Sequence, residues 1–402
     1  MTDPTAPARL GFDTARLSRI SAWMQGHVDD GRLAGLAVQI TRRGETVFSD
    51  RAGLQDVDQN ITVRPDALWR IYSMTKPVTS LAAMMLYEEG AFQLDQPVAD
   101  VLPAFEHLRV WKGSGHALED TIPLARPITI HDLLTHQSGL VYGDPNGTPL
   151  ERALSGAGLD FDQDIPTMAD AVARLTEVPL AFQPGARWFY GLSTDVLGHL
   201  VEVISGTTLG AFFEERIFAP LSMNDTGFDV EADQAHRLAV LYEQSGTGFA
   251  PMADQGTHVA PKTLQSGGAG LVSTMADYQR FADMLLRRGA YEGGHLLGRK
   301  TFDLMVMNHM GGDLASRGQT HFSETTMEGI GFGLGMSVML DPARAKIIGS
   351  PGEFAWGGWA STAFWVDPVE EMTVILMTQL APSSAYTLRR QLRVLSYQAL
   401  IG

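Results

Sequence analysis

The segments of this chain that have the pattern of β-strands lie near its two ends. Near the start, residues 36–48 contain two short apolar runs around an Arg-Gly turn, which predicts a hairpin. Near the end, residues 363–376 contain two such runs around an Asp-Pro turn and predict a second hairpin. Because strands must bury their apolar faces against partners, the two hairpins predict one α/β domain that is built from both termini.

The residues between the hairpins are richer in helical patterns, which alternate with loops that carry proline and glycine. We therefore expect an α/β domain at residues 1–80 and 265–402, in which helices flank an antiparallel sheet. An inserted, mainly helical domain is expected at residues 81–264. A length of 402 residues suits two such intertwined domains, and the active site is expected at their interface.

The formal net charge of −16 restricts the partners that the chain can bind. No excess of Lys and Arg is available to neutralise phosphates, which argues against a nucleic-acid partner. No apolar run approaches the roughly 18 residues that a membrane span needs. The first residues also lack the basic and apolar regions of a signal peptide. We expect a cytoplasmic protein without a nucleic-acid or membrane partner, and its oligomeric state is left open.

The residue types that bind metals are scarce or poorly spaced. The chain contains no cysteine, which excludes disulfides, thiol catalysis and cysteine metal sites. His131 and His136 are too far out of phase to share one helix face, and no H-E-x-x-H sequence is present. We expect neither a metal ion nor an organic cofactor.

A serine and a lysine at helical spacing carry the clearest chemical signal. Ser73 and Lys76 open a segment whose apolar residues repeat at helical spacing and which ends near Gly90. Positions i and i+3 share a helix face, so the hydroxyl and the amine point the same way. The helix N-terminus and burial both favour the neutral amine, which can accept the serine proton. No serine lies in a G-x-S-x-G elbow, which argues against an α/β-hydrolase.

Residues 73–77 (Ser-Met-Thr-Lys-Pro) resemble the active-site motif of the family VIII carboxylesterases, relatives of class C β-lactamases and penicillin-binding proteins. Further segments resemble this family in the same order along the chain: 128–140, 184–198, 220–226, 268–274 and 356–358. Six ordered matches make coincidence improbable. The resemblance implies a β-lactamase/transpeptidase-like α/β (α+β) fold and a serine esterase that forms an acyl-enzyme.

The resemblance also implies roles for individual residues. Ser73 is the implied nucleophile, and Lys76 and Tyr190 are its implied base system. An adjacent ammonium would stabilise the Tyr190 phenolate, so either group can be the direct base. The backbone amides of Ser73 and Trp359 are the implied oxyanion donors. Tyr142 lies where members of the family line the acyl pocket.

Departures from the β-lactamase pattern bear on the substrate. Trp356 stands where the β-lactamases carry the lysine that meets the β-lactam carboxylate. Leu192 occupies the Asn position of the Tyr-x-Asn pattern and removes an amide donor. Both changes suit neutral esters. The two glycines after Trp356 would let an acyl group approach the strand edge closely. The expected substrate contacts are Trp356, Gly357, Gly358, Tyr142 and Leu192.

The sequence therefore predicts a serine carboxylesterase that hydrolyses small, short-acyl esters. Three alternatives remain. An acyltransferase would keep the acyl-enzyme and pass the acyl group to an alcohol or amine. A β-lactamase or D-Ala-D-Ala peptidase would use the same nucleophile, but Trp356 and Leu192 disfavour it. A non-catalytic binding protein would be expected only if Ser73, Lys76 or Tyr190 had been lost.

Overall fold

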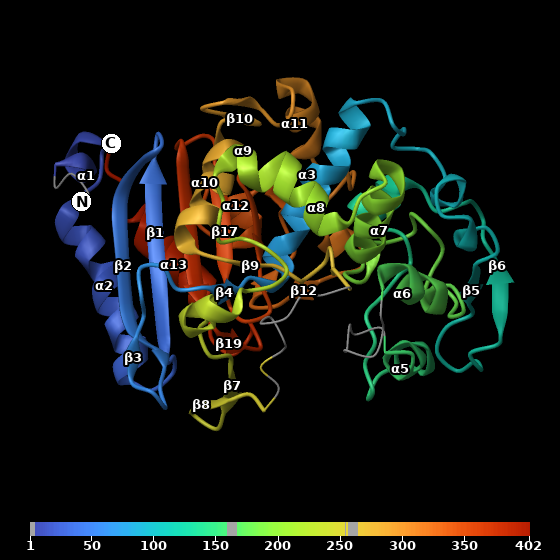
Figure 1. Ribbon diagram of the computed structural model, residues 1–402, viewed down its shortest axis with the longest axis horizontal. Coiled ribbons are helices and arrows are strands. Elements are labelled where there is room, and N and C mark those ends of the chain that lie inside the picture. Colours follow the sequence, from blue (N-terminus) through green and yellow to red (C-terminus); the bar gives the residue numbers. More distant parts are fainter. Residues whose placement is uncertain (1–4, 159–166, 254, 256–263) are drawn as a thin grey trace.

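The computed structural model of the protein describes residues 5–158, 167–253, 255 and 264–402. Its centre is an eight-stranded sheet in which every neighbouring pair of strands is antiparallel (Figure 1). In spatial order the strands are β14 (Ile330–Phe332), β15 (Ser337–Met339), β16 (Phe354–Gly357), β17 (Ala363–Asp367), β18 (Met372–Thr378), β1 (Gly35–Arg42), β2 (Glu45–Asp56) and β3 (Ile61–Thr62).

The two predicted hairpins form and lie side by side in this sheet. β1 pairs with β2, and β17 pairs with β18. The hairpins are joined by β1 and β18, where Leu36 lies opposite Thr378 and Val38 lies opposite Leu376. Strands from the two ends of the chain therefore complete one sheet, as the sequence predicts.

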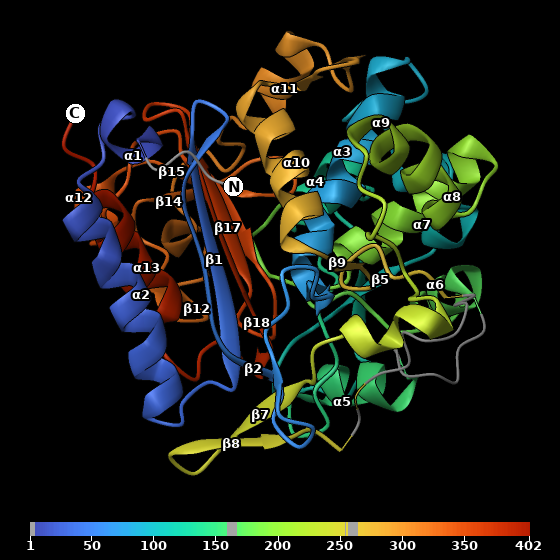
Figure 2. The ribbon, with the colours of Figure 1, turned by 60° about the vertical axis from the view of Figure 1, so that its left-hand side comes forward.

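Alternate residues of β1 and β18 serve two different apolar cores, because successive side chains of a strand point to opposite faces. On one face, Val38 and Leu376 pack with helices α2 (Thr14–Asp29) and α13 (Leu388–Tyr397). On the other face, Ile375 packs with α3 (Thr75–Glu88) and α10 (Met275–Leu286). Figure 2 shows α2 and α13 on one side of the sheet and α3 and α10 on the other.

The helical part lies beyond α3 and packs against it through α7 (Ser193–Ser205). Its other helices are α4 (Ile130–Leu134), α5 (Pro149–Gly156), α6 (Met168–Leu175), α8 (Leu209–Phe213) and α9 (Ala219–Leu221). α3 runs through residue 80, where the sequence analysis set a domain boundary, and it carries both Lys76 and the contact with α7. Its apolar residues are buried on all sides of the helix, which places α3 at the centre of the molecule.

Short strands and helices complete the fold. The short strand pairs are β4 (Trp69–Arg70) with β9 (Val272–Ser273), β5 (Arg109–Trp111) with β6 (Thr121–Pro123), β10 (Ala290–Tyr291) with β11 (Gly294–His295), and β12 (His321–Phe322) with β13 (Thr325–Thr326). A three-stranded sheet joins β19 (Leu380–Ala381), β7 (Tyr242–Ser245) and β8 (Gly248–Pro251). The remaining helices are α1 (Ala6–Arg9), α11 (Arg299–Met305) and α12 (Pro342–Ala345).

Within the described residues, no single helix has the length and apolar composition that a membrane crossing requires. Only the pair Ser193–Ser205 and Leu209–Leu221, bent by 78° at their junction, meets that requirement together.

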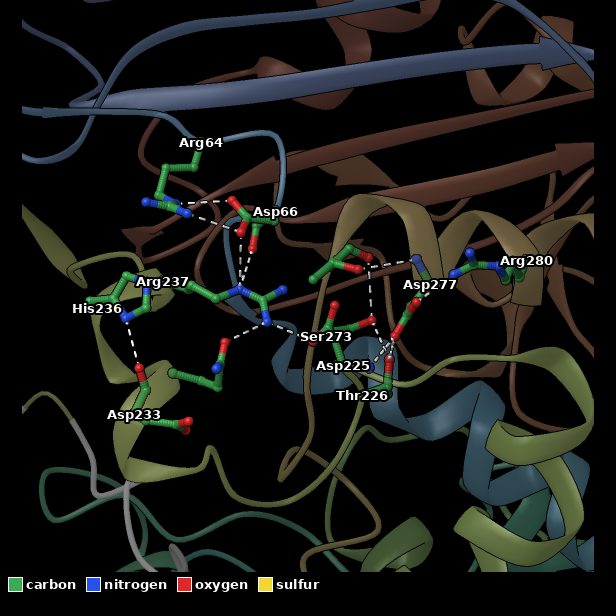
Figure 3. Close-up of polar contacts among 12 residues, drawn as sticks. Arg64, Asp66, Asp225, Thr226, Asp233, His236, Arg237, Ser273, Asp277 and Arg280 are labelled. Carbon is green, nitrogen blue, oxygen red and sulfur yellow. Dashed lines mark hydrogen bonds and ion pairs between the residues drawn. The ribbon is translucent and has the colours of Figure 1, made fainter.

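A polar network fixes the chain that leads into the segment carrying Ser73 (Figure 3). The Arg237 guanidinium donates to the carbonyl of Asp66 at 2.9 Å and to the carboxylate of Asp225 at 2.7 Å. Asp277, on α10, accepts from the Asp225 amide at 2.7 Å and from the Thr226 hydroxyl at 3.1 Å. Because Asp66 lies only a few residues before β4, these bonds tie that strand to α10 and to the loop at residues 220–226.

Candidate active site

Ser73 lies in a single 3-10 turn, η1 (Tyr72–Met74), that runs directly into α3. Tyr72 has a φ of 43°, a left-handed conformation that is costly for a residue with a side chain. Such strain is maintained only where surrounding contacts hold it, and here the Tyr278 hydroxyl donates to the Met74 carbonyl at 2.9 Å. Ser73 is half-buried. The turn therefore presents the hydroxyl at the N-terminal end of a buried helix.

Lys76 is 1% exposed, and its amine has three polar partners. Its Nζ lies 3.3 Å from Ser73 Oγ, 2.9 Å from Tyr142 Oη and 2.7 Å from the carbonyl oxygen of Gly268. An ammonium has three N–H donors, so these contacts can satisfy all of them. The Ser73 contact is the longest of the three. The structure therefore brings together the serine and the lysine that the sequence predicts as a pair.

The two tyrosines of the site hold different positions around Lys76. Tyr142 Oη accepts the 2.9 Å hydrogen bond from Nζ, whereas Tyr190 places the face of its ring 4.6 Å from Nζ, in a cation–π contact. Burial raises the pKa of Tyr142 well above its usual range, and the neighbouring Tyr190 and Asp195 raise it further. Tyr142 is therefore a neutral phenol at physiological pH. The sequence assigned Tyr142 to the substrate, but the structure places it against the amine.

The Tyr190 hydroxyl is buried and has no hydrogen-bond partner among the described residues. Its ring is fixed by aromatic neighbours: the ring of Phe322 lies 4.8 Å away, that of His136 4.9 Å and that of Trp356 5.4 Å. A buried hydroxyl without a partner costs stability, so its retention calls for an explanation. A rigidly held phenol whose hydroxyl makes no hydrogen bond to the described residues can hydrogen-bond to a reacting group.

Asp195 is a buried carboxylate of this site that the sequence analysis did not single out. It lies in the first turn of α7 and accepts hydrogen bonds from Ser266 Oγ at 2.5 Å and from the Gly268 amide at 2.9 Å. Gly268 in turn accepts from Lys76. Burial raises the pKa of Asp195, and the positive charge of Lys76 partly opposes that shift. The signal in the sequence was its place on the same segment as Tyr190, within a stretch already matched to the family.

The end of β16 lies beside the nucleophile turn. The ring of Trp359 packs edge-to-face on that of Tyr72, with centroids 5.4 Å apart. A Cβ on Gly358 would collide with the carbonyl oxygen of Ile71. These contacts bring the turn after β16 against the turn that carries Ser73, where the sequence predicts the oxyanion pair. The Trp359 side chain is 44% exposed, which leaves an indole face at this edge of the site.

The physical reason for the two glycines differs from the one expected. A Cβ on Gly357 would lie 2.6 Å from the Arg389 guanidinium, and one on Gly358 would meet Thr362 and Ile71. Protein atoms therefore fill the space that a side chain at either position would need. Close approach of backbone and side chains within the fold requires glycine at these positions.

Two expected substrate contacts lie within the core. Leu192 is 1% exposed and precedes α7, so its side chain has no surface for a ligand. Trp356 is 9% exposed and packs between the rings of Tyr190, Phe322 and Phe332. The expectation that both side chains line the substrate is therefore wrong for Leu192. Trp356 supports the Tyr190 ring from behind.

The two histidines considered as metal ligands lie apart and have other partners. The ring of His131 is 3.1 Å from that of His309, and the His136 ring packs on Tyr190. Across the part of the chain that the structure describes, no three His, Asp or Glu side chains converge as a metal site would require.

Comparison with known proteins places these features in a family. The family model Beta-lactamase matches residues 20–398, a range that contains every residue of the candidate site. Protein Rv1367c of Mycobacterium tuberculosis is 35% identical over 360 residues, which cover 88% of each chain. Esterase EstB of Burkholderia gladioli is 32% identical over 403 residues, which cover 94% of each chain. The solved structure of EstCE1, described as a hydrolase with promiscuous acyltransferase activity, superposes with a TM-score of 0.79 at 27% identity and covers 96% of this chain and 99% of that one.

Proposed function

Because this chain belongs to the Beta-lactamase family and is a serine ester hydrolase of that fold, we propose that it hydrolyses small, neutral, short-acyl esters through an acyl-enzyme at Ser73. The observation that carries this proposal is the 3.3 Å contact between Ser73 Oγ and Lys76 Nζ. A serine hydroxyl is a weak nucleophile, and an amine at this distance can take its proton as the hydroxyl attacks.

In the acylation step, Ser73 Oγ bonds to the ester carbonyl carbon while its proton moves to Lys76. The carbonyl oxygen gains the negative charge, which the Ser73 and Trp359 amides stabilise. When the tetrahedral intermediate collapses, the ester C–O bond breaks and the leaving alkoxide needs a proton. The Tyr190 hydroxyl is suited to deliver it, and the Lys76 ammonium against its ring face balances the charge of the phenolate that remains.

In the deacylation step, a water molecule attacks the acyl carbon and passes a proton to the same base system. The bond to Ser73 Oγ then breaks, Oγ takes a proton back from that base system, and the carboxylic acid leaves. The contacts around Lys76 favour it as the direct base, because its amine meets Ser73 Oγ whereas the Tyr190 hydroxyl has no such bond among the described residues. Tyr142 holds the amine in place as a neutral hydrogen-bond acceptor.

The proposed preference for neutral esters rests on Trp356, which stands where the β-lactamases carry a lysine that binds the carboxylate of a β-lactam. Trp356 is uncharged and buried behind Tyr190, so no lysine side chain stands at that position to meet a carboxylate. EstB, which is named as an esterase, and EstCE1, which is described as a hydrolase, support ester cleavage as the main reaction.

Initial rates on p-nitrophenyl acetate, butyrate and octanoate, measured beside a chromogenic cephalosporin, test the proposal. We expect fast turnover of the short esters, little lactam cleavage, and loss of both in Ser73→Ala. Ser18→Ala, a change at an exposed serine of α2, is the matched control and should keep full activity. Full activity in Ser73→Ala, or dominant lactam cleavage, would contradict the proposal.

Acyl transfer is the second candidate, and the similarity to EstCE1 favours it, since that protein is described as having promiscuous acyltransferase activity. An alcohol added to the ester assay would compete with water for the acyl-enzyme. A rise in the ester product with alcohol concentration, at constant p-nitrophenol release, would indicate transfer from a common intermediate.

A further inference from the structure

The side chain of Arg389, in the first turn of α13, reaches under the end of β16. Its Nη2 donates to two carbonyl oxygens, that of Gly358 at 2.8 Å and that of Thr362 at 3.0 Å. The Gly358 amide also donates to the Thr362 carbonyl, at 2.9 Å. The guanidinium therefore closes the turn that joins β16 to β17 and holds its two ends together.

One of these carbonyls belongs to the peptide unit that supplies the second oxyanion donor. The Gly358 C=O and the Trp359 N–H are parts of one planar peptide group, and in a trans peptide they point in opposite directions. Arg389 binds the oxygen side of this plane. The Trp359 N–H is then directed away from Arg389.

We propose that Arg389 is a positioning residue that orients and polarises the Gly358–Trp359 peptide so that its N–H serves the oxyanion. The inference rests on the proposed function, because it needs a reaction that develops negative charge on a carbonyl oxygen. A cation at the carbonyl draws electron density away from the amide nitrogen and makes the N–H a stronger donor. That gain is largest when the oxyanion forms, and therefore acts on the transition state more than on the bound ester.

The surroundings of Arg389 are built to keep it in this position. The Arg389 amide donates to Glu324 Oε1 at 3.0 Å, and Glu324 lies in the turn between β12 and β13. The same hairpin carries Phe322, whose ring packs on Tyr190. Gly357 leaves the space through which the guanidinium passes. One hairpin thus anchors both the Arg389 helix end and the Tyr190 ring.

The neighbouring arginines of α13 bond elsewhere and provide matched controls. Arg390 Nη2 donates to the Lys346 carbonyl at 3.1 Å, and Arg393 pairs with Glu353. Arg390→Met removes the same charge one residue away from Arg389 without touching the turn. Arg389→Met removes the charge and both hydrogen bonds, and Arg389→Lys keeps the charge but replaces the rigid, planar guanidinium with a flexible ammonium.

The test compares these variants with the wild type in steady-state turnover of p-nitrophenyl butyrate and in the rate at which a fluorophosphonate labels Ser73. We expect Arg389→Met to lower kcat by about 100-fold with little change in KM, as for loss of an oxyanion donor. Labelling should slow in parallel, since phosphonylation also places negative charge on an oxygen in the same position. Arg389→Lys should lie between Arg389→Met and the wild type, and Arg390→Met should resemble the wild type.

The outcomes distinguish the inference about Arg389 from the proposed ester hydrolysis at Ser73. If the wild type labels at Ser73 and Arg389→Met labels at the same rate, the inference is wrong and the proposed function stands. A raised KM at unchanged kcat would also overturn it, because Arg389 would then anchor the substrate. If the wild type is not labelled at Ser73, the proposed function itself fails. Should Arg389→Met not fold, as judged by thermal unfolding, the comparison of Arg389→Lys with Arg390→Met decides in the same way.

Discussion

Lys76 Nζ lies 2.9 Å from Tyr142 Oη, closer than its 3.3 Å contact with Ser73 Oγ. The hydrogen bond directs one N–H of the amine away from Ser73. A further N–H is directed to the Gly268 carbonyl at 2.7 Å. In the neutral amine two N–H groups would satisfy these two acceptors, so the lone pair is left for the Ser73 proton. Tyr142 and Gly268 therefore orient the amine as a base.

This arrangement predicts that Tyr142→Phe lowers catalysis by disorienting Lys76. Loss of one hydrogen bond to a charged or ionisable group is worth about 1.5–3 kcal/mol, or roughly 10- to 100-fold in rate. We expect that loss in kcat/KM for p-nitrophenyl butyrate. An unchanged kcat/KM would mean that Gly268 alone is enough to orient the amine.

Tyr190→Phe should separate activity from stability. The Tyr190 hydroxyl is buried without a partner among the described residues, so its removal should leave the melting temperature unchanged or slightly higher. The rate of acylation should fall by about 100-fold or more, because the leaving alkoxide loses its proton donor. Thermal unfolding and single-turnover kinetics on one preparation measure both effects. A clear loss of stability with full activity would contradict the role given to this hydroxyl.

Asp195 predicts a pH dependence of stability. Burial raises its pKa in the folded state, so the folded protein binds this proton more readily than the unfolded chain does. The contribution of Asp195 therefore becomes more favourable as the pH falls through the folded-state pKa, and less favourable as the pH rises above it. We expect Asp195→Asn to flatten this part of the profile of unfolding free energy against pH.

The same substitution should slow acylation, because Asp195 accepts from the amide of Gly268, whose carbonyl oxygen accepts from Lys76. Denaturant unfolding between acid and neutral pH, beside ester turnover, measures both effects. A pH profile identical to that of the wild type would show that Asp195 does not titrate differently in the two states.

Gly357→Ala should disturb Arg389 directly. The new Cβ would lie 2.6 Å from the guanidinium, so the side chain or the strand must shift. We expect a loss of stability of about 1–3 kcal/mol, typical of overpacking, together with a fall in kcat. Gly26→Ala is the control, since Gly26 lies in α2 with nothing within 4 Å of the added Cβ, and it should stabilise the protein by about 0.5–1 kcal/mol. If Gly357→Ala and Gly26→Ala changed stability and kcat equally, the proposed effect of Gly357 on Arg389 would be contradicted.

Local patterns were enough to predict a large part of this protein. Apolar residues that alternate along a strand predict the hairpins near the two ends. Residues that repeat every three to four positions predict the buried helix that begins after Ser73 and the contact between Ser73 and Lys76. The structure confirms each of them. The resemblance of ordered segments predicted the family and the fold, and the comparisons confirm both.

The errors and omissions concern contacts between distant segments. Leu192 was predicted to line the substrate from its place beside Tyr190, but it is buried because it precedes α7 in the core. The glycines after Trp356 were explained by access for the acyl group, whereas they accommodate Arg389 and Ile71. Nothing near these residues in the sequence indicates which distant atoms will occupy the neighbouring space.

The sequence by itself thus determined the contact between Ser73 and Lys76 and the layers of the fold, because helix and strand periodicity express these within a few residues. Only the tertiary structure decided how the amine is oriented and how the turn after β16 is held. The partners of Lys76 lie 66 and 192 residues away along the chain, and Arg389 reaches Gly358 from a separate helix. Such contacts depend on how helices and sheet pack together, and the local pattern of residues does not encode that packing.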